Sequence, residues 1–390
     1  MYILLLAIIY LAFISLGLPD SLLGSAWPTI RMDFDEPLSY MGVVSMIIAG
    51  GTILSGLMSE RLTKRFTAKI VTTVSVLITA IALYGFSTTT SFYQLCLWGI
   101  PYGLGAGAID SALNNYVALH YNARHMSWLH CFWGVGTIIS PYIMSYALTH
   151  TVWTDGYRLT SYLQFGIVVI LALALPLWKV NKAAEAEEKN AKVLGLKGAL
   201  KIKGVPYLLT GFFAYCAAEA TTMLWASSYL EGARGASKEE AAAFGALFFI
   251  GITVGRFLAG FISDKVGDNR MVYLGAAIAL GGVLCIALPF EKTALVGFVI
   301  IGLGCAPIYP CIIHSTPRNF GADNSQGIIG IQMASAYVGS TFMPPVFGLM
   351  ANHVSLRLMP IYLALFFVLM IVMIKKTAKV CVGGETWKRN

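Results

Sequence analysis

The chain has 390 residues, of which 57% are hydrophobic and only 12% are charged, with a formal net charge of +8. Soluble domains average about 45–50% apolar and about 25% charged residues. This composition therefore excludes an ordinary soluble domain and indicates a membrane protein.

Apolar runs long enough to cross a hydrocarbon core of about 30 Å as helices recur with short breaks along the whole chain. The expected fold class is an all-α membrane protein. We predict twelve transmembrane helices, at residues 3–30, 39–60, 68–87, 93–119, 127–149, 159–178, 205–230, 241–263, 271–289, 293–316, 326–350 and 357–375.

Lys and Arg residues collect in alternate connections between the predicted helices. Most of the 27 lie in segments that share one side with the N-terminus, including 61–69, 179–203 and 375–389. Because cytoplasmic loops are enriched in Lys and Arg, we expect both termini to be cytoplasmic, in a multi-pass protein of the plasma (inner) membrane. The net charge then follows from topology, and no nucleic-acid partner is expected.

The longest polar break covers residues 179–204 and mixes Lys with Glu and Ala. It predicts a cytoplasmic linker between an N-terminal six-helix bundle, 1–178, and a C-terminal six-helix bundle, 205–376. Residues 377–390 are expected to form a cytoplasmic tail.

Short phrases repeat between the two halves in the same order. GLMSERLTKR recurs as GFISDKVGDNR, GLG occurs at Gly103 and at Gly302, and FISLGLPD aligns with FFAYCAAE, which sets Asp20 against Glu219. The GLG glycines are expected to let helices approach closely. Two pseudo-symmetric six-helix bundles are typical of a carrier that alternates access by rocking one half on the other, with its site near the membrane midplane.

Three acidic residues and one basic residue fall inside predicted helices rather than at their ends, namely Asp20, Asp110, Glu219 and Arg256. A charge at the membrane centre costs about 2.5–3.5 kcal/mol and normally faces a bundle interior or an aqueous cavity. Desolvation favours the neutral form of a carboxyl group, so the three acids are candidates for proton coupling, although they could equally supply oxygens to a sodium ion. An ion pair of Arg256 with Glu219 or Asp110 is the structural alternative.

Polar and aromatic residues near these acids are candidates for binding a substrate. Asp110 and Asn114 share one helix face, and Asn115 adds a second amide, which suits a neutral polyhydroxylated ligand. His130 and Trp133 share a face of the next helix, and aromatic rings can cover the C–H faces of a sugar. The candidates in the C-terminal half are Tyr215, Trp225, Tyr309 and Gln332. Ordinary packing or solvation is the alternative for each.

The repeated loop phrases place acidic and basic residues at equivalent cytoplasmic positions in both halves. Charge pairs there would latch an inner gate and break when it opens, whereas a solvated turn is the alternative. The gating and structural candidates are Glu60, Arg61, Arg65, Arg256, Asp264 and Lys265.

The twelve-helix plan, the doubled loop phrase and the central linker resemble the major facilitator superfamily along essentially the whole chain. Within it, the N-terminal half is similar to the fucose:proton symporter family, which includes glucose and mannose symporters, in PDSLLGSAWP, GAIDSALNNYV and LHCFWGVGTIISP. The resemblance implies sugar and proton roles for Asp20 and Asp110, and sugar contacts for Asn114 and His130. Trp133 departs from the shorter polar residue of the fucose permease, and Asp110 stands where Glu is common.

We therefore expect a secondary active transporter that imports a small sugar, such as a hexose, by proton-coupled symport with alternating access. A sodium-coupled sugar symporter and a proton-driven exporter of drugs or metabolites are the alternatives. No enzyme is expected, because HExxH, P-loop and Ser/His/Asp patterns are missing from the sequence. We expect no cofactor and no metal, and the seven cysteines form no CxxC pair. The expected partners are the sugar and the lipid bilayer, with a monomer as the expected state.

Overall fold

A computed structural model describes residues 2–178 and 193–381, which divide into two compact units. Unit 1 comprises residues 1–116 and 129–195, and unit 2 comprises residues 117–128 and 196–390. The division differs from the expected bundles in one respect: segment 117–128, which joins two helices of the N-terminal half, belongs to unit 2. Of the predicted linker and tail, residues 179–192 and 382–390 lie outside the described residues.

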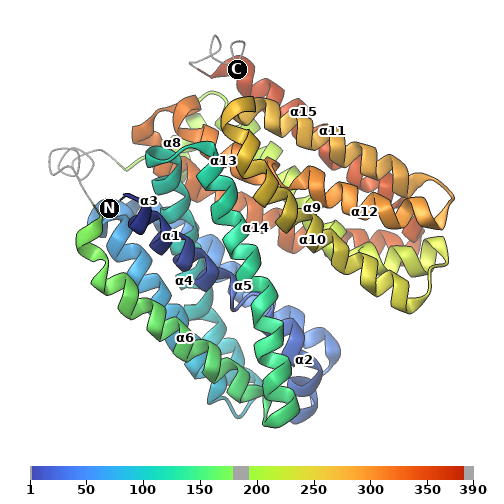
Figure 1. The fold of residues 1–390 in the computed structure, drawn as a ribbon, viewed down its shortest axis with the longest axis horizontal. Helices are drawn as coiled ribbons and strands as arrows, with labels where there is room; N and C mark the ends of the chain where they lie inside the picture. The colour runs from blue at the N-terminus through green and yellow to red at the C-terminus, as the bar shows by residue number, and fades with distance from the viewer. Residues whose placement is uncertain (1, 179–192, 382–390) are drawn as a thin grey trace. The chain divides into compact units, whose positions relative to one another are not determined.

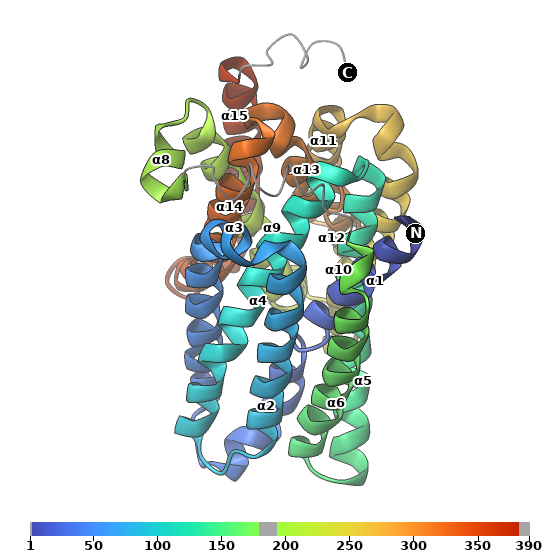
Figure 2. The same cartoon turned by 90° about the vertical axis from the view of Figure 1, so that its left-hand side faces the viewer.

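Unit 1 is built from long helices (Figures 1 and 2). Helix α3 packs on α6, and α1 and α2 also contact these two helices. The helices are α1 (Tyr2–Gly17), α2 (Leu22–Asp33), α3 (Met41–Ser87), α4 (Phe92–His120), α5 (Ala123–His150) and α6 (Trp153–Leu173), with short 3-10 turns at Leu38–Tyr40 and Leu175–Leu177.

In unit 2, α9 packs mainly on α14 and α15, while α10 and α11 both pack on α12 (Figure 1). The helices of the C-terminal half are α8 (Gly195–Lys201), α9 (Val205–Arg234), α10 (Lys238–Val266), α11 (Asp268–Ala287), α12 (Glu291–Cys305), α13 (Ile308–Phe320), α14 (Ala322–His353) and α15 (Met359–Val380), with a 3-10 turn at Leu356–Leu358.

Four of the predicted spans are arranged differently from a simple helix. The expected spans 39–60 and 68–87 follow each other without a loop and together form α3. The helix is kinked at a non-helical residue, Thr67, with φ 68° and ψ 154°. The first span is not one helix, because it breaks between α1 and α2 beside Pro19. The tenth span also breaks, between α12 and α13 beside Pro307. A proline lacks an N–H and disfavours helical geometry at the residue before it, so both breaks have a local cause.

Within the described residues, seven helical segments are long and apolar enough to cross a membrane by length and composition alone. The long helices outside this set are α4, α9, α10 and α14. They carry the polar residues expected to face the bundle interiors, including Asp110, Glu219, Arg256 and Gln332. When the broken spans are each counted once and α3 twice, the helices supply the twelve spans expected from the sequence.

The GLG phrase of α4 forms close helix contacts in unit 1. A Cβ atom added to Gly103 would lie 2.2 Å from the carbonyl oxygen of Ile48, and one on Gly105 would lie 2.8 Å from the carbonyl oxygen of Ser75. These partners lie on the two sides of the kink in α3. The glycines therefore let α4 pack directly against the backbone of both parts of α3.

The second GLG phrase, in α12, makes the equivalent contacts in unit 2. A Cβ atom on Gly302 would lie 2.6 Å from the carbonyl oxygen of Phe248 in α10, and one on Gly304 would lie 2.4 Å from the backbone nitrogen of Ala279 in α11. The expected role of these glycines in close helix packing is thus confirmed in both halves.

We expect Gly103→Ala and Gly302→Ala each to destabilise the protein by about 1–3 kcal/mol, because a methyl group must displace backbone rather than a flexible side chain. Thermal unfolding in detergent measures the effect. Gly50→Ala in α3 is the matched control, since among the described residues no atom outside its own stretch of helix lies within 4 Å of its added Cβ. Equal stability of all three variants would contradict the packing role.

Candidate functional site

Asp20 lies in the break between α1 and α2, and its side chain is exposed although its neighbour Pro19 is buried. The Tyr102 hydroxyl donates to one carboxylate oxygen at 2.8 Å, and the Trp133 ring nitrogen donates to the other at 2.9 Å. Both donors are neutral groups, so these hydrogen bonds stabilise a carboxylate without cancelling its charge. The sequence-predicted residues Asp20 and Trp133 are thus brought together.

The two donors are fixed by packing in unit 1. Tyr102 is buried in an aromatic core, where its ring meets Phe86 edge-on with centroids 6.4 Å apart. Trp133 lies where α5 comes very close to α1: a Cβ on Gly17 would lie 2.1 Å from the Trp133 carbonyl oxygen. This contact between backbones brings Trp133 within reach of the break that carries Asp20.

Asp110, Asn114 and His130 form a second cluster, and all three are buried. The Asn114 amide nitrogen donates to the Asp110 carboxylate at 2.8 Å and to its backbone carbonyl at 3.0 Å. The Asn114 amide oxygen lies 3.1 Å from His130 Nε2. An amide oxygen can only accept, so His130 donates through Nε2. Asn115 is buried beside this cluster.

The two clusters occupy successive levels of the same pair of helices. On α4, Tyr102 precedes Asp110 by eight residues, which is about 12 Å along a helix that rises 1.5 Å per residue. Helix α5 is antiparallel to α4, and on α5 His130 precedes Trp133. Asp20 with its donors therefore lies on one level, and Asp110 with Asn114 and His130 lies on the next.

Glu219 has a different environment, in unit 2. Its carboxylate is 3.2 Å from an Arg256 guanidinium nitrogen, and the two side chains are only 13% and 5% exposed. This is the ion pair that the sequence leaves open as the structural alternative for Glu219. Asp20 and Glu219 align in the internal repeat, but the first accepts from neutral donors and the second faces a cation.

The other candidates of unit 2 have partners within the unit. Tyr215 donates to the carbonyl of Cys305, the last residue of α12, at 2.9 Å, which satisfies a carbonyl at the helix break. Trp225 donates to a backbone carbonyl at 3.0 Å, and Tyr309 donates to a methionine sulfur at 3.2 Å. The Gln332 oxygen accepts from a threonine hydroxyl at 3.0 Å, while its buried nitrogen has no partner among the described residues.

Glu60, from the loop phrase of unit 1, is buried and accepts three hydrogen bonds. Lys64 donates to it at 2.9 Å, and the backbone N–H groups of Leu194 and Gly195 donate at 2.7 and 2.9 Å. The sequence-predicted Arg61 and Arg65 are exposed. The acid of the first phrase therefore binds backbone within the predicted linker, 179–204, together with a lysine that the sequence did not single out.

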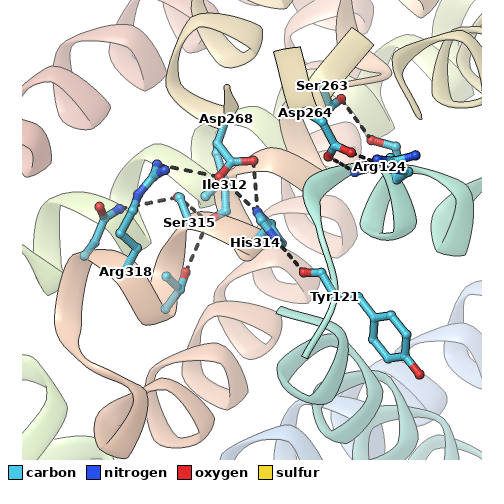
Figure 3. A network of polar contacts seen from close by, with 12 residues as sticks. Tyr121, Arg124, Ser263, Asp264, Asp268, Ile312, His314, Ser315 and Arg318 are labelled. Atoms are coloured by element: carbon cyan, nitrogen blue, oxygen red, sulfur yellow. Dashed lines mark hydrogen bonds and ion pairs between the residues drawn. The ribbon is translucent and has the colours of Figure 1, made fainter. Parts of the chain in front are cut away.

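Asp264, at the equivalent place in the second phrase, holds segment 117–128. It accepts from the backbone N–H of Arg124 at 3.0 Å and forms an ion pair with the Arg124 guanidinium (Figure 3). Trp128 packs on Gly260, where an added Cβ would lie 2.0 Å from the indole nitrogen. Lys265 is exposed. In both halves, the acid of the phrase accepts a backbone N–H from a segment distant in sequence.

A further polar cluster in unit 2 joins Asp268, His314 and Arg318 to Tyr121 (Figure 3). Asp268 belongs to the repeated phrase, four residues after Asp264, and that spacing is the signal that could have identified it. His314 and Tyr102 stand in apolar runs without any pattern that distinguishes them, so sequence reasoning missed both.

Comparison with known proteins agrees with the fold and the motifs. Residues 9–290 and 207–379 match the family model described as Major Facilitator Superfamily. The chain therefore belongs to the Major Facilitator Superfamily of membrane transporters.

Its relatives are distant. The chain is 22% identical over 392 residues to the Saccharomyces cerevisiae protein called Bypass of stop codon protein 6, an alignment that covers 90% of this chain and 77% of that one. It is 22% identical over 316 residues to the glucose/mannose transporter GlcP of Bacillus subtilis, covering 77% of each. The structure of FucP in the outward conformation superposes with a TM-score of 0.81 at 17% identity, covering 96% of this chain and 99% of FucP. That likeness shows a shared fold.

We expect Asp264→Ala to loosen segment 117–128 and to destabilise the protein by about 1–2 kcal/mol, because a backbone N–H near the start of α5 loses its acceptor. Trypsin cleavage after Arg124 should become faster, and the unfolding temperature should fall. Lys265→Ala is the matched control, since Lys265 is exposed. If both variants resist trypsin as well as the wild type does, Asp264 does not hold this segment.

Proposed function

We propose that the protein is a proton-coupled symporter that imports a small neutral sugar, such as a hexose, by alternating access. The observation that carries the proposal is the Asp20 carboxylate, which lies in a helix break, exposed, between the neutral donors Tyr102 and Trp133. An embedded carboxylate of this kind is normally a binding group for an ion or a substrate rather than a structural charge.

In this mechanism Asp20 binds a proton and the substrate together. Protonation removes the net charge, so the carrier can change its direction of access without moving an uncompensated charge through the membrane. Asp110, on the next level of α4 and α5, receives the proton and releases it on the other side. Asn114 and His130 position the Asp110 carboxyl group through the bonds at 2.8 and 3.1 Å.

The sugar would bind beside these acids. Trp133 offers an indole face for the C–H groups of a hexose, and Asn114 and Asn115 offer amide donors and acceptors for hydroxyl groups. The clusters contain neutral donors, which favours an uncharged ligand. The relatives support the class: GlcP carries glucose and mannose, and FucP is a fucose:proton symporter.

Glu219 and Arg256 have a structural role in this proposal. Their ion pair neutralises an embedded arginine, since a lone cation in a bundle interior would be costly. Glu219 is therefore not required to carry the coupling proton, although sequence alone makes it a candidate.

Glu60 and Asp264 would act as latches on the cytoplasmic side of the plasma membrane, where we propose that both termini lie because Lys and Arg are enriched in the segments that share their side. Each accepts backbone N–H groups from a segment distant in the chain, through bonds of 2.7–3.0 Å. Breaking such bonds would accompany opening to the cytoplasm. We propose a monomer with no cofactor, because one twelve-helix chain can enclose a complete pathway.

Uptake into proteoliposomes tests the proposal. We expect a panel of hexoses to identify one that accumulates when the outside is acid, and Asp20→Asn and Asp110→Asn each to abolish accumulation by removing a titratable group. Thermal stabilisation by the same sugar checks binding separately, because a ligand of the folded state raises its stability. Asp323→Asn, at an exposed site at the start of α14, is the matched control.

Three outcomes would contradict the proposal. If sugar accumulation follows a sodium gradient, the coupling ion is sodium and not the proton. Equal uptake with no gradient would exclude symport. If no sugar stabilises the wild type, the substrate class is wrong, and drug efflux in the same liposomes would favour an exporter.

A further inference from the structure

Both ring nitrogens of His314 face hydrogen-bond acceptors (Figure 3). Nδ1 lies 2.9 and 3.1 Å from the two carboxylate oxygens of Asp268 on α11. Nε2 lies 3.0 Å from the backbone carbonyl oxygen of Tyr121, in segment 117–128. All of these residues belong to unit 2.

This arrangement determines how many protons the cluster holds. A neutral imidazole has one donor nitrogen and one acceptor nitrogen, whereas an imidazolium has two donors. A carbonyl oxygen and a carboxylate can only accept. In either neutral tautomer, one ring nitrogen would direct its lone pair at an acceptor about 3 Å away. The observed contacts therefore require one more proton than a neutral His314 beside an ionised Asp268 would hold.

The charges around the ring agree with an ionised Asp268. An Arg318 guanidinium nitrogen lies 3.6 Å from the same carboxylate. From segment 117–128, the nearby titratable groups are Arg124, which is paired with Asp264, and His125, whose ring is 5.7 Å from that of Tyr121. Among the described residues, the charged groups that face His314 are thus Asp268 on α11 and Arg318 on its own helix, α13.

We propose that Asp268 and His314 form a proton-binding site, separate from Asp20 and Asp110, whose proton fastens segment 117–128 to α11 and α13. When the proton leaves to water, one ring nitrogen loses its hydrogen, and either the Asp268 bond or the Tyr121 bond is lost. The connection from Asp268 through His314 to Tyr121 is then broken, while Asp264 continues to hold Arg124 and Trp128 continues to donate to the Phe257 carbonyl. The segment is therefore loosened at Tyr121 and stays attached near the start of α5. This inference does not depend on the identity of the substrate.

Because segment 117–128 joins α4 to α5, the proton held by Asp268 and His314 also affects residues outside that site. Residues 117–128 contain the end of α4 and the start of α5. The same helices carry Asp110, Asn114 and His130. His314 is therefore a positioning residue: its protonation state controls how firmly the ends of these two helices are held, and cytoplasmic pH would control that state in the proposed orientation.

Nitrogen-15 NMR of histidine-labelled full-length protein in nanodiscs tests the protonation state directly. At neutral pH we expect one imidazolium ring in which both nitrogens are protonated, and this signal should be missing from His314→Gln. In Asp268→Asn the same ring should shift to a neutral form, because its carboxylate partner is gone. A neutral His314 in the wild type would overturn the proposal, whether or not the protein transports any sugar.

Hydrogen exchange of segment 117–128 tests the fastening. After correction for the intrinsic pH dependence of exchange, we expect the segment to open about tenfold more at pH 8.5 than at pH 6, as for the loss of one charge-assisted hydrogen bond. His314→Gln should show the faster rate at both values. His353→Gln, at the last residue of α14, is the control and should behave like the wild type. A wild-type rate independent of pH would overturn the proposal.

Discussion

The cost of placing charge in hydrocarbon is the constraint on which this structure depends. Each embedded acid has its own partners inside a helical unit: Asp20 accepts from two neutral donors, Asp110 accepts from the Asn114 amide, and Glu219 pairs with Arg256. These environments differ in net charge, although the residues are chemically alike. An acid beside neutral donors retains a charge that a proton can remove, whereas an acid paired with arginine is already neutralised. The division that we propose between coupling and structural roles rests on this difference.

The internal repeat preserves packing more faithfully than it preserves charge. Gly103 and Gly302 bring α4 and α12 against the backbone of equivalent helices, and Glu60 and Asp264 both accept backbone N–H groups from distant segments. A carrier that rocks needs similar halves, and these contacts supply the similarity. The aligned acids Asp20 and Glu219 have different partners, so we expect the two halves to differ in function.

Much of the fold was predictable, because hydropathy, the positive-inside rule and repeated phrases can all be read from short stretches of the sequence. The pairing of Asp110 with Asn114 was predictable for the same reason, since helical spacing places the two on one face. The contact of Asn114 with His130 joins two helices and was not predicted. The hydrogen bond from Tyr102 to Asp20 joins residues 82 positions apart, and the bond from Arg124 to Asp264 joins residues 140 apart. No local pattern reports such contacts. The helix break beside Pro307 was also missed, because an average over an apolar run conceals a single residue.

The central claim is that Asp20 binds the coupling proton together with the substrate while Glu219 does not. It is tested most directly by adding the transported sugar to weakly buffered purified protein that contains a pH indicator. Because coupling between two ligands is reciprocal, binding of the sugar should draw protons from solution in the wild type and in Glu219→Gln, and should draw none in Asp20→Asn. Proton uptake that persists in Asp20→Asn but disappears in Glu219→Gln would contradict the account.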